Sequence, residues 1–174
     1  LNQEFSQRTV GDPMDHEVDM GPLRSQHQLA LLESQMTDAA QKGATIKVGG
    51  KRREGKGFFY DPTILGNVTP EMKVMQEEVF GPVAPIYVAR DVESAVQIAN
   101  DTEFGLGASI WTNDSAKGRE LALRMECGVV FVNELVRSDP RMPFGGIKQS
   151  GIGRELSRFG LLEFVNVKSI NLYS

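Results

Sequence analysis

The sequence predicts an α/β domain of three layers with a largely parallel sheet. From about residue 83 to residue 132, short apolar runs alternate with segments of helical periodicity, in the order strand, helix, strand, helix, strand. Such alternation is typical of a buried parallel sheet with helices on both faces. The 174 residues are 40% apolar and 24% charged and contain neither repeats nor a Pro- or Ser-rich linker. We therefore expect one domain over residues 1–163.

The first half contributes a helix and two extended segments. Between residues 25 and 42 the apolar side chains step by three and four, so that Leu29, Leu32, Met36 and Ala39 share a helical face. An alternating β-branched run follows at residues 44–48 and ends in a glycine pair. Residues 58–65 form a second extended piece, in which Pro62 predicts an edge strand or a bulge.

The second half supplies the alternating pattern itself. A strand is expected at residues 83–88, and Asp91 then caps a helix because its carboxylate can accept the free amide hydrogens of the first turn. A strand at 108–111 precedes a helix at 115–126 capped by Asp114, and a strand at 129–132 follows. The pattern adds a helix at 154–163 and a terminal strand within residues 164–174. That strand lacks a hairpin neighbour, so we expect it to pair with another chain or segment.

Charge and hydropathy exclude several classes of protein. With 19 basic and 23 acidic residues the net charge is −4, which provides no basic field for nucleic acid. The apolar runs are too short for a membrane span, and the first residues do not resemble a secretory signal. A single cysteine excludes an internal disulfide and fits the cytoplasm. The missing initiator Met leaves open that the chain lies within a longer protein.

Generic motifs predict neither a catalytic residue nor a metal site. Cys127 lies at an expected helix C-terminus, where the dipole disfavours a thiolate, so we interpret it as a packed, structural cysteine. His16 and His27 lack partners at metal or triad spacing. Neither a Gly-x-Ser-x-Gly elbow nor a Gly-x-Gly-x-x-Gly fingerprint occurs.

Two segments nevertheless have the chemistry of a binding site. Residues 77–82 (EEVFGP) place two carboxylates and a ring at a tight turn, where a carboxylate can accept hydrogen bonds from ribose hydroxyls. Residues 142–148 (MPFGGIK) form a Gly-rich loop that can approach a ligand closely. A solvated acidic turn and a flexible crossover are the simpler alternatives.

These segments, taken together and in order, resemble the C-terminal part of the catalytic domain of the aldehyde dehydrogenase superfamily. The resemblance covers essentially the whole chain. It rests on residues 10–13 (VGDP), 19–23 (DMGPL), 59–63 (FYDPT), 77–82 (EEVFGP), 128–133 (GVVFVN), 143–148 (PFGGIK) and 153–155 (GRE).

The resemblance implies NAD- or NADP-dependent oxidation of a small aldehyde through a cysteine thiohemiacetal. It assigns Glu78 to the nicotinamide-ribose hydroxyls, Phe80 to the ring beside that ribose and Phe144 to the substrate tunnel. The family's Gly-Gln-x-Cys nucleophile segment does not occur in the chain, so we expect the chain alone to be inactive. The segment at residues 164–174 matches the strand through which members form homo-oligomers.

The loop before Phe144 is similar to that of a succinate-semialdehyde dehydrogenase branch. Arg137 or Arg141, with Ser138 beside them, could hold the distal carboxylate of the substrate, because a guanidinium binds carboxylates in a two-point fork. Both arginines could equally be surface charges. Two alternative functions stay open: an aldehyde dehydrogenase for another aldehyde, and a non-catalytic assembly module.

Overall fold

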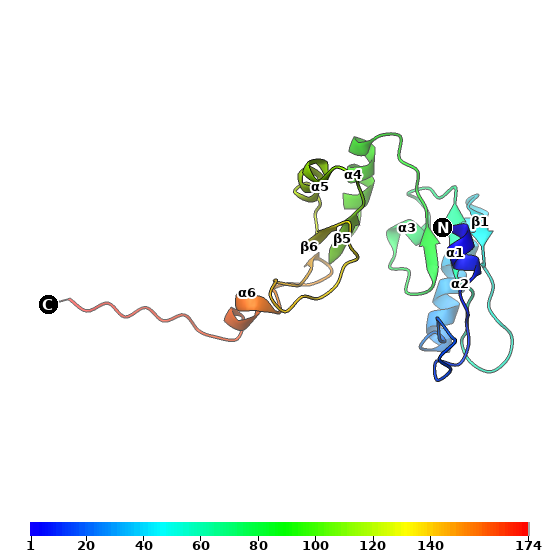
Figure 1. Ribbon diagram of the computed structural model, residues 1–174, viewed down its shortest axis with the longest axis horizontal. Coiled ribbons are helices and arrows are strands. Elements are labelled where there is room, and N and C mark those ends of the chain that lie inside the picture. Colours follow the sequence, from blue (N-terminus) through cyan, green and yellow to red (C-terminus); the bar gives the residue numbers. More distant parts are fainter. Residues whose placement is uncertain (174) are drawn as a thin grey trace. The chain divides into compact units, whose positions relative to one another are not determined.

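The computed structural model describes residues 1–173, which form two compact units, residues 1–89 and residues 90–173 (Figure 1). Each unit combines helices with a small sheet that contains a parallel pair of strands. The predicted α/β class is confirmed. Residues 1–163, expected as one domain, are shared between the two units, and that domain boundary stays a prediction.

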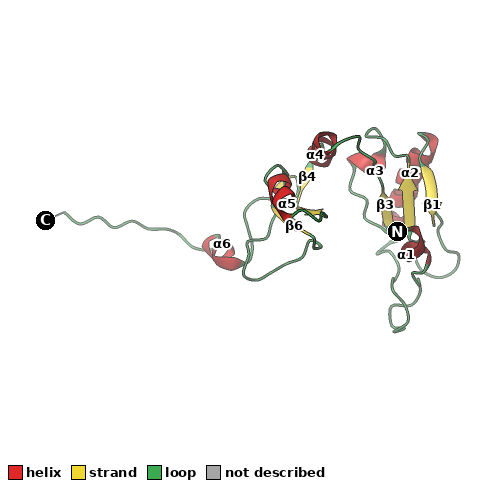
Figure 2. Cartoon of the chain, turned by 45° about the horizontal axis from the view of Figure 1, so that its top comes forward, coloured by secondary structure: helices red, strands yellow, loops and turns green. Residues whose placement is uncertain are grey.

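Unit 1 consists of a three-stranded sheet and its helices (Figure 2). The strand order is β1-β2-β3, with β1 antiparallel and β3 parallel to the central strand. Its elements are α1 (Asn2–Ser6), α2 (Gln26–Gln41), β1 (Thr45–Val48), β2 (Thr63–Gly66), α3 (Lys73–Gln76) and β3 (Val83–Pro85).

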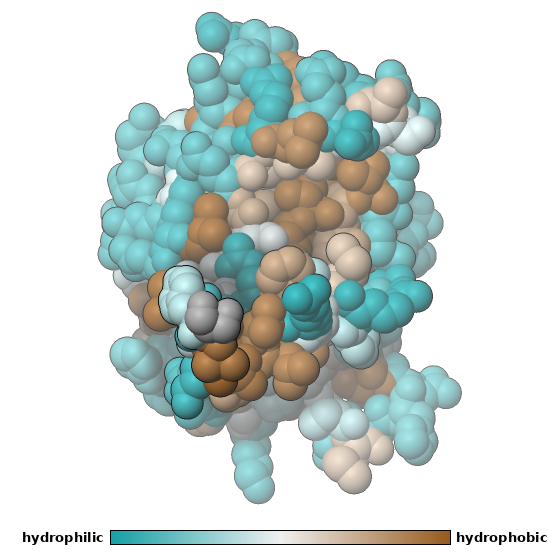
Figure 3. Space-filling model, turned by 90° about the vertical axis from the view of Figure 1, so that its left-hand side faces the viewer, coloured by the Kyte–Doolittle hydropathy of each residue, from teal (hydrophilic) through white to brown (hydrophobic). Residues whose placement is uncertain are grey.

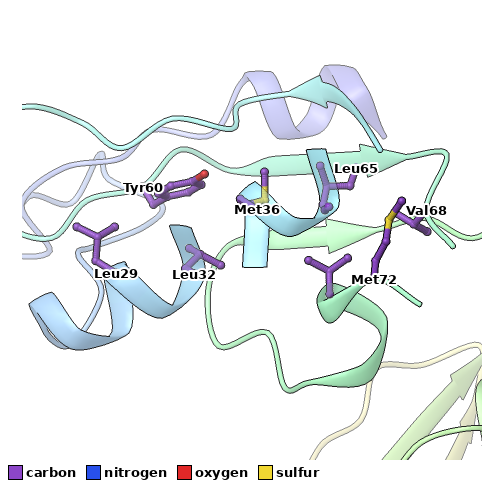
Figure 4. Packing of buried hydrophobic residues seen from close by; sticks show 9 residues of the cluster. Leu29, Leu32, Met36, Tyr60, Leu65, Val68 and Met72 are labelled. Carbon is purple, nitrogen blue, oxygen red and sulfur yellow. The ribbon is translucent and has the colours of Figure 1, made fainter. Parts of the chain in front are cut away.

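Helix α2 forms where its apolar spacing predicts. The Ser25 hydroxyl accepts a hydrogen bond from the backbone N–H of Gln28 at 3.2 Å, which caps the first turn. The predicted apolar face is buried, and it packs against residues from the sheet and from α3 (Figure 4). The core cluster comprises Leu29, Leu32, Met36, Ala39, Tyr60, Leu65, Val68, Met72 and Val74.

Of the two alternatives predicted from Pro62, the edge strand is wrong, whereas the pairing of β1 with β2 does shift register between Ile46 and Val48, as at a β-bulge. Pro62 lies directly before β2, so the strand itself keeps its amide donors and pairs on both sides. Thr63, the first residue of β2, donates its backbone N–H to the Pro82 carbonyl at 2.8 Å. Proline at the start of a strand is compatible with a central position because it removes no ladder hydrogen bond there.

Unit 2 contains two two-stranded sheets: β5 runs parallel to β6, and β4 runs antiparallel to β7. Asp91 and Asp114 cap their helices as predicted, each accepting a backbone N–H three residues on. The elements are α4 (Val92–Asn100), β4 (Phe104–Gly105), β5 (Gly107–Ile110), α5 (Ser115–Ala122), β6 (Val129–Val132), β7 (Ile147–Lys148) and α6 (Ser157–Leu162).

Helix α5 ends four residues earlier than predicted. The Asn100 side chain donates to the Arg124 carbonyl at 2.8 Å and accepts from the Glu126 N–H at 2.9 Å. These bonds replace the intrahelical bonds that residues 124 and 126 would otherwise make. A partner distant in sequence thus shortens the helix, which local periodicity does not reveal.

The described part of the C-terminal segment has no regular structure. Residues 164–173 follow α6 without helix or strand, and all are exposed. Figure 1 shows the segment running away from α6. Because the expected strand would pair with a second chain, its formation stays a prediction.

Candidate functional site

The acidic turn of unit 1 lies between α3 and β3. Glu78 and Phe80 are exposed, whereas Val79 between them is half-buried and packs against the core cluster. Phe80 is 65% exposed, which is a high value for an aromatic residue. Within residues 1–173, no side-chain hydrogen bond engages the Glu78 carboxylate, so it is free to accept one from a ligand.

A hollow of about 550 Å³ in unit 1 adjoins Phe80. Its size is that of a small-molecule site. It combines apolar walls with an amide and a guanidinium that can orient a polar ligand. It is lined by Met20, Gly21, Pro22, Leu23, Arg24, Gln28, Tyr60, Phe80, Gly81 and Pro82.

One face of α2 holds this turn in place. Gln28 donates its side-chain amide to the Phe80 carbonyl. Gln35 donates to the Glu77 carboxylate and to the Glu78 carbonyl, both at 3.1 Å. Sequence reasoning did not identify Gln35, although a signal exists: it is a polar residue within the apolar face of an amphipathic helix.

The loop of unit 2 before Phe144 is organised by an internal ion pair. Asp139 accepts hydrogen bonds from Arg141 Nε at 3.0 Å and from a terminal guanidinium nitrogen at 2.7 Å. The Arg141 guanidinium holds the pKa of the Asp139 carboxyl well below its ordinary value, and the carboxylate raises the pKa of Arg141. The Arg141 side chain is 87% exposed, so the pair lies on the surface.

Arg137 and Ser138 are less constrained than Arg141. Arg137 approaches Glu134 at 3.4 Å through one terminal nitrogen and is 68% exposed. Ser138 is exposed as well. Arg137 thus retains most of its donors for an external carboxylate, whereas Arg141 already uses its fork on Asp139.

Phe144 is held at the start of the Gly-rich loop by an isolated β-bridge to Glu155. The two residues exchange backbone hydrogen bonds of 2.9 and 2.8 Å. Phe144 lines a hollow of about 390 Å³ in unit 2, together with loop glycines, Arg154 and Glu163. Gly145 has a φ of +157°, in a region that L-residues with side chains rarely occupy. The Gly-rich loop therefore forms one wall of this hollow.

Comparison with protein families identifies the chain. Residues 1–170 match the model of the aldehyde dehydrogenase family. The chain belongs to this family. The turn with Glu78 and the loop with Phe144 both lie within the matched range.

The most similar relatives of this aldehyde dehydrogenase chain include enzymes named for one substrate. The chain is 48% identical to succinate semialdehyde dehydrogenase [NAD(P)+] Sad of Escherichia coli over 161 residues, which is 92% of this chain and 35% of the relative. It is 43% identical to succinate-semialdehyde dehydrogenase [NADP(+)] of Deinococcus radiodurans over 99% of this chain and 36% of the relative. The chain thus spans about a third of the length of these relatives.

Solved structures agree with the family assignment. Succinic semialdehyde dehydrogenase from Streptococcus pyogenes, solved with NADP+, matches 99% of this chain and 38% of its own, with a TM-score of 0.95 and 37% identity. Aldehyde dehydrogenase from Bacillus cereus, solved with NAD+, matches 98% of this chain and 35% of its own, with a TM-score of 0.93 and 35% identity.

Cys127 has the environment of a packed thiol in this aldehyde dehydrogenase chain. Burial raises the pKa of the thiol, which therefore stays protonated at neutral pH. Its Sγ donates to the Val129 carbonyl at 3.2 Å. Both observations support the prediction of a structural role.

The described residues offer neither a metal-binding cluster nor a membrane-spanning helix. Residues 1–173 contain no group of three or more His, Cys, Asp or Glu side chains arranged to hold a metal ion. Over the same residues, every helix is too short or too polar to span a bilayer.

Proposed function

We propose that this chain is the C-terminal part of the catalytic domain of an NAD(P)-dependent aldehyde dehydrogenase that oxidises succinate semialdehyde to succinate. The observation that carries the proposal is the 48% identity to a succinate semialdehyde dehydrogenase over 92% of the chain. In the full-length enzyme, a cysteine thiolate outside this chain attacks the aldehyde carbon and gives a thiohemiacetal. Loss of a hydride then gives a thioester, which water hydrolyses to the acid.

The acidic turn supports a role in holding the cofactor. The bound dinucleotide would accept the hydride. Glu78 offers a free, exposed carboxylate whose oxygens can accept hydrogen bonds from two ribose hydroxyls. Phe80 places an exposed ring beside a hollow large enough for a ribose and a nicotinamide. A carboxylate and an exposed aromatic ring therefore fit the nicotinamide-ribose part of the dinucleotide that the family uses.

The loop of unit 2 supports a role in recognising the carboxylate of the substrate. Arg137 is the better of the two arginines, because its contact with Glu134 is single and long whereas Arg141 is held by both oxygens of Asp139. Ser138, next to Arg137, adds a hydroxyl donor. Phe144 would supply an apolar wall for the carbon chain of the substrate.

The test of substrate class uses the full-length enzyme that carries this chain. Arg137→Ala should raise the KM for succinate semialdehyde about tenfold or more, because a charge-assisted hydrogen bond to the substrate is lost. The KM for butyraldehyde, which lacks the distal carboxylate, should stay within about twofold. Arg141→Ala should have the smaller effect on succinate semialdehyde. Equal effects of Arg137→Ala on both aldehydes would contradict the role of Arg137 in recognising the distal carboxylate.

A second assay tests whether the chain alone is inactive. The 174-residue chain and the full-length protein are compared for reduction of NAD+ and NADP+ with succinate semialdehyde. We expect turnover only from the full-length protein, because the chain lacks the family's Gly-Gln-x-Cys segment. Turnover by the chain that Cys127→Ser abolishes would contradict this.

The full-length enzyme should form a homo-oligomer in the cytoplasm through residues 164–174. Ten of these residues are exposed in the single chain, and apolar and polar side chains alternate from Val165 to Lys168 and again from Ile170 to Leu172. A strand that adds to the sheet of another subunit would bury that alternation. Light scattering on a variant that lacks residues 164–174 should show smaller particles than the intact protein. If the protein assembles but neither the 174-residue chain nor the full-length protein oxidises an aldehyde, the assembly-module alternative is favoured.

A further inference from the structure

Gln35 is a fully buried polar side chain in the core of unit 1. It is 1% exposed, and it lies on the face of α2 that also carries the buried Leu32 and Ala39. Burying an amide is unfavourable unless its donors find acceptors. Gln35 therefore needs partners, and its two amide hydrogens have acceptors at 3.1 Å in the acidic turn.

The two bonds of Gln35 distinguish the two carboxylates of the turn. The Glu77 carboxylate accepts one of them and is thereby directed toward α2. Glu78 instead contributes its backbone carbonyl, which leaves its carboxylate unengaged within the described residues. A single buried amide thus contacts the main chain at Glu78 and engages the carboxylate of the neighbouring Glu77.

The rest of the turn is fixed by the same face of α2. Gln28, seven residues before Gln35, donates to the Phe80 carbonyl. Between them, Leu32 packs so closely on Gly81 that an added Cβ would lie 2.8 Å from a Leu32 methyl carbon. Residues at spacings of four and three share a helical face, so these contacts form one row along the turn.

We propose that Gln35 is a positioning residue for the cofactor site: it sets the backbone of Glu78 so that this carboxylate meets the nicotinamide-ribose hydroxyls. The inference rests on the proposed function, in which Glu78 holds that ribose. Gln35 does not touch the cofactor. It acts because a carboxylate on a fixed backbone loses less conformational freedom when it binds than one on a loose turn.

The test measures dissociation constants with the full-length enzyme. The first probe is NAD+ or NADP+, whichever binds more tightly. The second is the matching fragment without the nicotinamide ribose, which is ADP for NAD+ and 2′,5′-ADP for NADP+. Gln35→Met, which keeps the volume and removes the donors, should weaken binding of the whole cofactor about tenfold. Binding of the fragment should change less than about twofold. Gln41→Met, the same substitution at an exposed position of α2, is the matched control and should alter neither.

A double mutant tests whether Gln35 acts through Glu78. If it does, Gln35→Met combined with Glu78→Gln should bind the cofactor no more weakly than Glu78→Gln alone. Equal weakening of cofactor and fragment by Gln35→Met, or additive effects in the double mutant, would overturn the inference. An effect of Glu78→Gln without any effect of Gln35→Met would overturn it while leaving the proposed function intact. If Glu78→Gln itself leaves cofactor binding unchanged, the ribose role of Glu78 fails, and the inference fails with it.

If Gln35→Met does not fold, Glu77→Ala tests the positioning role of Gln35 instead. Glu77 is exposed, so its truncation should leave the core intact. Removing one of the two acceptors of Gln35 should weaken the whole cofactor about threefold and spare the fragment. No change in either constant, or an equal change in both, would contradict the proposed role.

Discussion

The two units of the chain differ in how they bury their apolar side chains. In unit 1, the core cluster and Ile64 are buried between the helices and the sheet of the same unit. Among the described residues of unit 2, Val96 is the one buried hydrophobic side chain. Figure 3, which views the chain from the side of its C-terminus, shows apolar residues on the surface. Exposed in unit 2 are Val92, Leu106, Trp111, Leu123, Leu135, Val136, Met142, Ile152, Phe159, Leu161, Leu162, Phe164, Val165, Val167, Ile170, Leu172 and Tyr173.

The unequal burial of apolar side chains indicates that unit 1 specifies its own stability. Burial of apolar surface is the dominant favourable term in folding, so unit 1 contains the means to fold within residues 1–89. Unit 2 instead relies on hydrogen bonds and on strand pairing, and a monomer rarely exposes so many large apolar side chains. We infer that unit 2 reaches its full stability only when further protein surface covers it.

The largest expected effect comes from separating the units. Residues 1–89 expressed alone should unfold in one cooperative urea transition, because their core is intact. Residues 90–174 alone should bind a hydrophobic dye and lack a sharp transition, because little apolar surface is buried. Cooperative unfolding of the second piece, without dye binding, would erase the proposed difference.

Truncating a leucine should cost far more stability in unit 1 than in unit 2. Leu32→Ala removes a side chain that is 1% exposed and packs in the core cluster, so it should lower the free energy of unfolding by about 3 kcal/mol. Leu135→Ala, the same change at an exposed position of unit 2, should stay within about 0.5 kcal/mol. The two values come from urea unfolding of the 174-residue chain. Similar losses in both variants would show that Leu135 is buried in solution.

Local patterns predict unit 1 better than they predict the ends of elements in unit 2. The apolar face of α2 is correctly predicted because Leu29, Leu32 and Met36 repeat with the helical period and are all buried. The end of α5 is missed because Asn100, more than twenty residues away, bonds to Arg124 and Glu126. A pattern within a window does not contain such a long-range hydrogen bond.

In the candidate site too, local motifs are predictable from the sequence and long-range contacts are not. Glu78 and Phe80 are identified from the family motif that they form. Gln35 is missed because its importance depends on what lies across from it, the Glu78 carbonyl, which is 43 residues away in sequence. The unequal pairing of Arg137 and Arg141 is equally invisible in the sequence, where both arginines stand in the same short loop before Phe144.

A third prediction concerns the polar links that unit 2 uses in place of a core. Asn100→Ala leaves the Arg124 carbonyl and the Glu126 N–H without their partner, so it should lower the free energy of unfolding by about 2 kcal/mol. Asn171→Ala, in the exposed C-terminal segment, is the control and should have no measurable effect. Amide hydrogen exchange within α4, α5 and β6 of the 174-residue chain checks both, because unit 2 is not expected to unfold in a sharp transition. A loss as small as that of the control would mean that water replaces the Asn100 side chain.

The smallest expected effect is that of the surface ion pair between Asp139 and Arg141. Since the pKa of Asp139 is lowered from its ordinary value of 3.8, the folded protein binds this proton less readily than the unfolded chain. The stabilisation is therefore present above pH 3.8 and is lost as the pH falls through the lowered pKa. Solvent and salt screen an exposed pair, so the change in stability should be slight even though the titration shifts clearly. A pH titration of the Asp139 side-chain carboxyl by NMR should give a midpoint below 3.8, and Arg141→Gln should move it back toward that value. A midpoint that Arg141→Gln does not change would mean that Arg141 is free to bind a substrate carboxylate, which would remove the reason to favour Arg137.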